Sequence, residues 1–168
     1  MGDHGARQLS PIFSRSILRW DPRAKVYRLN LDDGFRQILK ELMQQFLDLL
    51  DDPGAPVLHR LFPPAYTAPV DLERQDEYRR LMMEDLVERR RAEGQIVLDS
   101  ATRKTLTEEE LLAWSRSING LRLALGTYLD VQEDDEVRPP QSPEESAYHL
   151  LSWLLEETVD AMSKQIGF

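Results

Sequence analysis

The chain contains no cysteine. Disulfide bonds, thiolate metal sites, cysteine nucleophiles and any thiol-based redox switch within this chain are therefore excluded. Histidine is also scarce, and His4, His59 and His149 are too scattered along the sequence to suggest a ligand set. The sequence also lacks a Gly-x-Ser-x-Gly elbow and a glycine-rich phosphate loop. These absences predict a protein without catalytic residues, without metal ligands and without a cofactor.

Long apolar segments are absent as well. No apolar run approaches the roughly 20 residues that a membrane-spanning helix requires, and residues 1–14 lack the apolar core of a signal peptide. We therefore expect a cytoplasmic protein that does not contact membranes. Apolar residues make up 41% of the chain and charged residues 30%, values typical of a globular domain. A length of 168 residues is enough for one domain with a substantial core.

The net charge of −9 is unevenly distributed along the chain. Residues 105–168 hold 4 Lys and Arg against 13 Asp and Glu, so this part would repel a phosphate backbone. Basic residues gather instead near the N-terminus, in a predicted hairpin. They are Arg15, Arg19, Arg23, Lys25 and Arg28. This basic hairpin is the region best suited to nucleic acid or to an acidic protein, and we expect DNA binding to be weak or absent.

The order of the predicted elements indicates one helical domain over residues 15–168, preceded by a flexible segment at residues 1–14. Ile17–Trp20 and Lys25–Leu31 are typical of two short strands joined by a type I turn with Pro22 at its second position. Because a lone hairpin is only marginally stable in water, these strands are expected to lie against helices.

Helical spacing of apolar residues predicts four main helices. The first begins at Asp32 or Asp33 and ends near Asp51, the second runs from Asp71 to at least Arg91, the third begins at the capping box Thr107–Glu110, and the fourth begins at Ser142–Pro143. A short turn is predicted at residues 57–62, and residues 131–141 form an acidic linker before the last helix. The predicted fold is mainly α, a helical bundle with a small N-terminal β-hairpin.

One face of the second predicted helix carries both apolar and charged residues. Its apolar members are Tyr78, Leu81, Met82, Leu86 and Ile96. Asp85, Arg89 and Glu93 fall within the same face, and Arg122 borders the apolar stripe of the next helix. Because an unpaired buried charge is costly, we expect these four residues to form a polar interhelical cluster, with Arg122 paired to Asp85 or Glu93.

The third predicted helix has a second stripe nearly opposite its main apolar face. The stripe consists of Leu112, Arg116, Asn119 and Leu123. A helix with two such faces either lies in the centre of a bundle or presents one face to a partner. Burial is slightly favoured by this pattern alone, and a partner face is the alternative. The basic run Arg89–Arg91 fans around its helix among acids, which favours an ion-paired face over DNA reading.

Three segments resemble a known family. They are Arg60–Tyr66, then Glu77–Leu81 leading to Asp85–Leu86, and then Trp114 through Asn119 to Leu129. These motifs resemble the actinobacterial Domain of Unknown Function 2017 family, whose members are described as AosR-type oxidative stress regulators. The resemblance implies a non-enzymatic cytoplasmic protein, encoded near the protease adaptor ClpS and sulfur-metabolism genes and linked to transcriptional responses under oxidative stress.

The partners that follow from this resemblance are proteins. A stress-response regulator would contact a sigma factor or RNA polymerase, whereas the alternative, an adaptor for regulated proteolysis, would contact the Clp system. A homodimer is a further arrangement that the sequence leaves open. Without cysteine the chain cannot sense oxidant through thiols, and oxidation of Met82 or Met83 is the remaining, less apt, route.

Overall fold

The computed structural model describes residues 16–52, 54, 72–132, 135–136 and 138–167. Over these residues the chain forms four helices and one small sheet, which confirms the predicted mainly α class. The elements are β1 (Leu18–Asp21), β2 (Val26–Leu29), α1 (Asp33–Leu50), α3 (Leu72–Ser100), β3 (Thr105–Leu106), α4 (Glu108–Tyr128) and α5 (Pro143–Ile166). The turn predicted at residues 57–62 and the segment at residues 1–14 lie outside the described residues.

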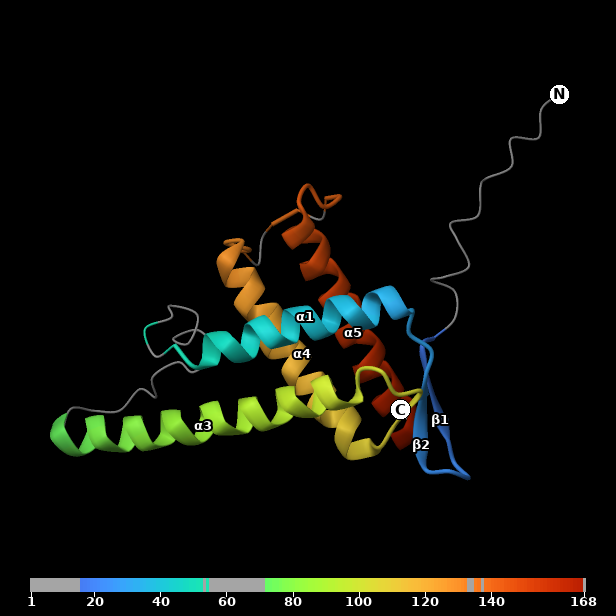
Figure 1. Ribbon diagram of the computed structural model, residues 1–168, viewed down its shortest axis with the longest axis horizontal. Coiled ribbons are helices and arrows are strands. Elements are labelled where there is room, and N and C mark those ends of the chain that lie inside the picture. The colour runs from blue at the N-terminus through green and yellow to red at the C-terminus, as the bar shows by residue number, and fades with distance from the viewer. Residues whose placement is uncertain (1–15, 53, 55–71, 133–134, 137, 168) are drawn as a thin grey trace.

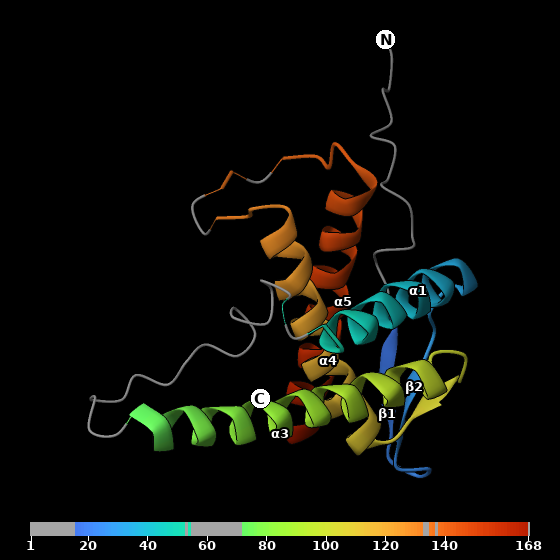
Figure 2. The same ribbon diagram turned by 60° about the vertical axis from the view of Figure 1, so that its left-hand side comes forward.

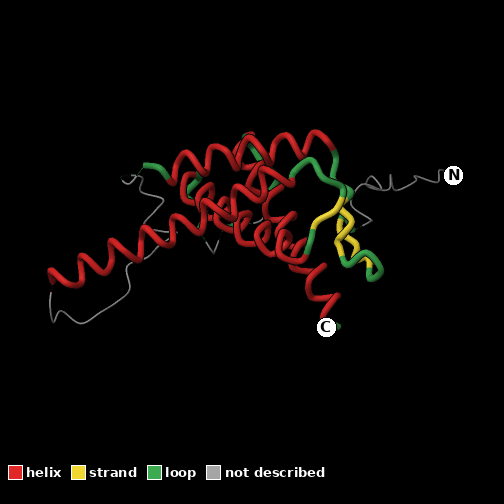
Figure 3. The backbone as a smooth tube through the Cα atoms, turned by 60° about the horizontal axis from the view of Figure 1, so that its bottom comes forward, coloured by secondary structure: helices red, strands yellow, loops and turns green. Residues whose placement is uncertain are grey.

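Helices α4 and α5 lie side by side, and α1 crosses them on one face (Figures 1 and 2). Helix α3 packs against both α1 and α4. Its C-terminal end reaches the sheet, whereas its N-terminal end extends beyond the other helices (Figures 1 and 3). The long helix α3 is therefore only partly covered by the rest of the fold.

The predicted hairpin forms, and it gains a third strand. Strands β1 and β2 pair antiparallel, with Leu18 opposite Leu29, and β2 pairs with β3, with Tyr27 opposite Leu106. Lys25 closes the hairpin turn at φ 56, in the left-handed region. Strand β3 has only two residues, too few for alternation to reveal it in the sequence.

The predicted starts of α1, α4 and α5 are confirmed by their caps, whereas the start predicted at Asp71 lies outside the described residues. The side chain of Asp32 accepts a hydrogen bond from Gly34 N in α1, and Thr107 Oγ1 accepts one from Glu110 N in α4. Ser142 caps α5 in the same way, with Pro143 in the first turn. At the other end of α5, Gly167 adopts φ 87, a left-handed conformation that favours glycine.

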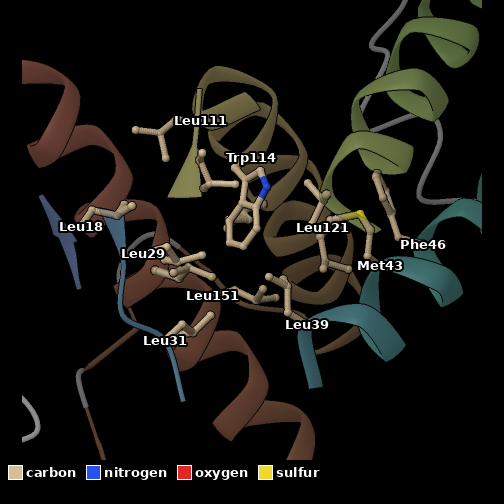
Figure 4. Close-up of a cluster of buried hydrophobic side chains, with 14 of the residues drawn as sticks. Leu18, Leu29, Leu31, Leu39, Met43, Phe46, Leu111, Trp114, Leu121 and Leu151 are labelled. Carbon is tan, nitrogen blue, oxygen red and sulfur yellow. The ribbon is translucent and has the colours of Figure 1, made fainter. Parts of the chain in front are cut away.

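The core lies where the sheet, α1, α4 and α5 meet (Figure 4). Trp114 and Met43 are completely buried, and Leu39, Leu121 and Leu151 pack in the same cluster. The apolar stripes predicted for α1, α4 and α5 supply these side chains. Three of the four predicted packing faces therefore point inward.

Helix α3 is the exception, because most of its predicted packing face points outward and, of its apolar members, Leu86 packs against the core. Tyr78 is 62% exposed, Leu81 59% and Met82 42%. The helix instead turns Met83, Val87, Gly94 and Val97 toward the core. The two helices pack closely here: a Cβ on Gly94 would lie 2.7 Å from Leu47 Cδ2 of α1, so a larger residue would require the Leu47 side chain to shift.

A buried arginine joins the sheet to α1 and to the end of α3. Arg36 is 8% exposed, and its guanidinium donates to four main-chain carbonyls. The acceptors are the carbonyl oxygens of Leu29, Leu31, Ala101 and Arg103, at distances of 2.7–3.2 Å. Carbonyl dipoles, rather than a carboxylate, stabilise the buried charge of this side chain.

Candidate protein interface

The four residues predicted to form a polar interhelical cluster do not come together, so that prediction is wrong in its pairing. Asp85 and Arg89 form an exposed pair within α3, with Arg89 Nη2 2.9 Å from Asp85 Oδ2. Glu93 pairs with Arg90 and Arg116, whereas Arg122 lies against Tyr148 of α5. The cause is the orientation of α3, since the face that carries Asp85 and Arg89 points to solvent rather than to α4.

Glu93 bridges α3 and α4 in place of the predicted cluster. Its carboxylate lies 3.3 Å from Arg90 Nη1 and 3.4 Å from Arg116 Nη1, and its side chain is 18% exposed. Arg90 also donates to the carbonyl oxygen of Arg116. Within the described part of the chain, Glu93 is the one member of the predicted cluster with an interhelical ion pair, and its partner Arg116 belongs to the predicted partner face.

The predicted partner face of α4 is open to solvent at its N-terminal end. Leu112 is 41% exposed and the side chain of Arg116 is 57% exposed, while Asn119 and Leu123 are half-buried. The stripe is therefore neither buried in the centre of the bundle nor exposed to solvent along its whole length. Arg116 contacts Glu93 of α3, so the exposed end of the stripe adjoins that helix.

Arg122 packs on an aromatic ring. Its guanidinium carbon lies 5.8 Å from the centroid of the Tyr148 ring, and its Nη1 donates to the Tyr148 hydroxyl at 3.4 Å. The buried Nε has no hydrogen-bond partner among the described residues. Gly126 of α4 also lies close to this ring, since a Cβ there would lie 3.1 Å from Tyr148 Cε2. Arg122 therefore links α4 to α5 rather than to α3.

Glu145 holds the end of the acidic linker against α5. Its carboxylate accepts from Gln141 N and from Arg138 Nη2, each at 2.8 Å. The Gln141 hydrogen bond, followed by the charge of Arg138, lowers the pKa of Glu145. His149 lies one turn further along α5 and adds a weaker electrostatic contribution. Among the described residues, no group of three or more His, Asp or Glu could hold a metal ion.

The described part of the basic hairpin is exposed. Arg19, Arg23 and Lys25 lie at the surface, whereas Arg28 is paired with Asp21 at 2.7 Å. Hydrogen bonds from Ala24 N and from the Arg28 side chain lower the pKa of Asp21, which keeps this carboxylate charged inside the basic patch. Arg15 lies outside the described residues.

An open apolar groove of 650 Å³ lies between α1, α4 and α5. Its base is formed by Phe46 and Leu121, both almost fully buried. Its apolar walls are exposed or half-buried: Ile38, Leu42 and Leu49 of α1, Leu125 and Tyr128 of α4, and Pro143 and Ala147 of α5. Glu41 and Glu144 stand at its edge, so the groove combines an apolar floor with an acidic rim.

Sequence reasoning missed this groove because three helices far apart in sequence build it. Ile38 and Tyr128 fall on or near predicted apolar stripes, yet they are 41% and 77% exposed. Residues of such stripes are usually taken as core. The one available signal was the width of the α1 stripe, which has more apolar positions than one neighbouring helix can cover.

The fold and its surfaces define a small, mainly helical domain whose candidate sites are an apolar groove and exposed apolar stripes. None of the described helices is long and apolar enough to cross a membrane. The chain belongs to the family described as "Domain of unknown function (DUF2017)", which matches residues 17–162.

Relatives of the chain carry a descriptive name. Proteins called "Oxidative stress regulator AosR" in Mycobacterium bovis (strain ATCC BAA-935 / AF2122/97) and Mycobacterium tuberculosis (strain ATCC 25618 / H37Rv) are each 31% identical to this chain. Each match covers 84% of this chain and 85% of the relative. No solved structure matches the chain. The predicted family resemblance is thereby confirmed.

Proposed function

We propose that this protein is a non-enzymatic stress-response regulator that acts by holding a protein partner in the groove between α1, α4 and α5. The groove is the observation that carries the proposal, because large apolar side chains line it and remain open to solvent. Helix-binding grooves in other proteins have this composition. The name of the mycobacterial relatives supports the regulatory role.

The chemistry of the groove specifies its occupant. An amphipathic helix with apolar residues on one face would displace water from Leu42, Leu49 and Leu125. Basic residues beside that face would meet Glu41 and Glu144 at the rim. We propose that this helix belongs to a sigma factor or to RNA polymerase, so that the regulator acts through the transcription machinery in the cytoplasm.

A capture experiment with a matched pair of variants tests this function. Ile38→Glu places a charge in the groove, and Val159→Glu places the same charge on an exposed apolar residue of α5 outside it. Because both side chains are exposed, neither change should alter the free energy of unfolding by more than about 0.5 kcal/mol. From native lysate, Ile38→Glu should lose sigma factor or polymerase subunits that wild type and Val159→Glu retain.

Two other results would contradict the proposal. If Ile38→Glu retains every partner of the wild type, the groove is not the binding site. If the lost partners are Clp subunits, the protein is an adaptor for regulated proteolysis instead of a transcriptional regulator.

A further inference from the structure

The outward face of α3 carries a regular seam of residues. Its members are Tyr78, Met82, Asp85, Arg89, Ala92 and Ile96, all exposed. The intervals between them alternate between four and three residues, which is the spacing of a coiled-coil seam. At 1.5 Å per residue the seam is about 27 Å long. No element of the described chain covers it.

The order of residues along the seam is self-complementary. From either end it reads two apolar residues and then a charged residue, with Asp85 in one half and Arg89 in the other. A two-fold axis beside Val87 would pair Asp85 of one helix with Arg89 of a second copy, and the reverse. The same axis would place Tyr78 opposite Ile96. Met82 would then lie opposite Ala92.

We propose that a second copy of this chain binds the seam, and that the two α3 helices pack antiparallel. The charges select this direction, because a parallel in-register pair would place Asp85 against Asp85 and Arg89 against Arg89. In the antiparallel pair both central contacts join opposite charges. The Asp85–Arg89 pair within each helix shows that both groups already lie on one face.

The shape of the molecule suits this arrangement. The N-terminal half of α3 extends beyond the bundle (Figures 1 and 3), so it can lie along the α3 of a second copy. There it would reach Ile96 and the adjacent part of α4, where Leu112 is 41% exposed. Glu93 and Arg116 join the two helices at this point. The dimer would thus cover the exposed end of the predicted partner face.

Charge reversal tests the central contacts. Asp85→Arg should raise the dimer dissociation constant at least tenfold in sedimentation equilibrium. The reason is that the introduced arginine of each copy would face Arg89 of the other copy, so both central contacts would join like charges. Arg89→Asp should do the same, and the double variant Asp85→Arg/Arg89→Asp should restore dimerisation. Glu84→Arg is the matched control, since Glu84 is exposed but lies off the seam. Circular dichroism checks that all four variants keep their helices.

Engineered cysteines test the direction, and the absence of native cysteine removes any background. A mixture of the Met82→Cys and Ala92→Cys variants should form disulfide-linked dimers under mild oxidation, whereas each variant alone should form few. Cross-linking of each variant with itself would overturn the antiparallel pairing. A wild-type chain that stays monomeric at concentrations on the order of 100 µM would overturn the dimer.

The proposed dimer and the proposed regulator function can be disproved independently of each other. No residue of α3 lines the groove, so Ile38→Glu should leave dimerisation unchanged. A dimer lost in Ile38→Glu but retained in Asp85→Arg would place the contact between copies in the groove and overturn the seam.

Discussion

The indole Nε1 of Trp114 donates a 2.8 Å hydrogen bond to the hydroxyl oxygen of Ser100, and both side chains are buried. Ser100 in turn donates to the carbonyl oxygen of Ile96. The pair therefore joins α4 to the last turn of α3 and leaves no polar atom of the indole unpaired. Trp114 contributes apolar area to the centre of the core, and the hydrogen bond to Ser100 offsets the cost of removing its N–H from water.

Replacing Ser100 with alanine should leave the buried indole N–H without an acceptor. We expect the free energy of unfolding to fall by about 1–3 kcal/mol, measured by urea denaturation. Thr102→Ala, an exposed position two residues further on, should change it by less than about 0.5 kcal/mol. An equally small change for Ser100→Ala would mean that the hydrogen bond adds nothing to stability.

Replacing Arg36 should lower the free energy of unfolding more than replacing Ser100, because four main-chain carbonyls accept hydrogen bonds from its guanidinium. Arg36→Met removes all four donors and keeps much of the side-chain volume. At about 1–3 kcal/mol for each unsatisfied buried group, the loss of stability should reach at least 3 kcal/mol. Arg103→Met is the control, since its side chain is 55% exposed and pairs with Glu110 at the surface. Equal stabilities of the two variants would contradict the role of Arg36.

Gly94 should resist replacement even by alanine. The helix propensity of alanine favours the change by about 1 kcal/mol, whereas overpacking against Leu47 opposes it by about 1–3 kcal/mol. We expect a net loss of stability on thermal unfolding, and Leu47→Val in the same chain should recover part of it. Gln95→Ala, exposed on the same helix, provides the control. Stabilisation by Gly94→Ala would show that the end of the Leu47 side chain moves aside for the added methyl group at little cost.

Acid should weaken the attachment of the linker to α5. The pKa of Glu145 is lower in the folded state than in the unfolded chain, where it is about 4.3. Glu145 therefore contributes fully to stability at pH values above this unfolded-state pKa, and the contribution is lost as the pH falls through the pKa of the folded state. Glu145→Gln should therefore lower the melting temperature near pH 7, and its difference from wild type should shrink near pH 3. Melting temperatures of both proteins between pH 3 and pH 7 measure this, and a difference that stays the same on acidification would contradict the role of Glu145.

The features predicted correctly from sequence are those that depend on neighbouring residues. Thr107 and Glu110 are three positions apart, and Ser142 and Pro143 are adjacent, so each helix start is encoded locally. Helix α3 differs because apolar residues occur on two of its faces, with Met82 and Met83 next to each other. Its orientation depends on the contact of Gly94 with Leu47, far away in sequence.

The same distinction explains what was missed at the candidate sites. The acceptors of Arg36 are main-chain carbonyls, which no sequence pattern displays. The groove depends on how α1 crosses α4 and α5, and periodicity does not determine a crossing angle. The predicted charge cluster was wrong because it assumed that every apolar stripe is buried.

Direct, sequence-specific DNA binding should not be the main activity of this protein. Regulators that read DNA present base-contacting side chains within a basic footprint, and here the described basic hairpin offers only Arg19, Arg23 and Lys25 unneutralised by Asp21. The acidic residues of α5 and of its preceding linker would repel phosphate. We expect only non-specific binding, with dissociation constants on the order of 10⁻⁴–10⁻⁶ M that rise steeply with salt.

A gel-shift titration of purified protein against its own promoter region measures this directly. The triple variant Arg19→Ala/Arg23→Ala/Lys25→Ala should abolish the residual binding, whereas nanomolar binding that survives competitor DNA would contradict the prediction.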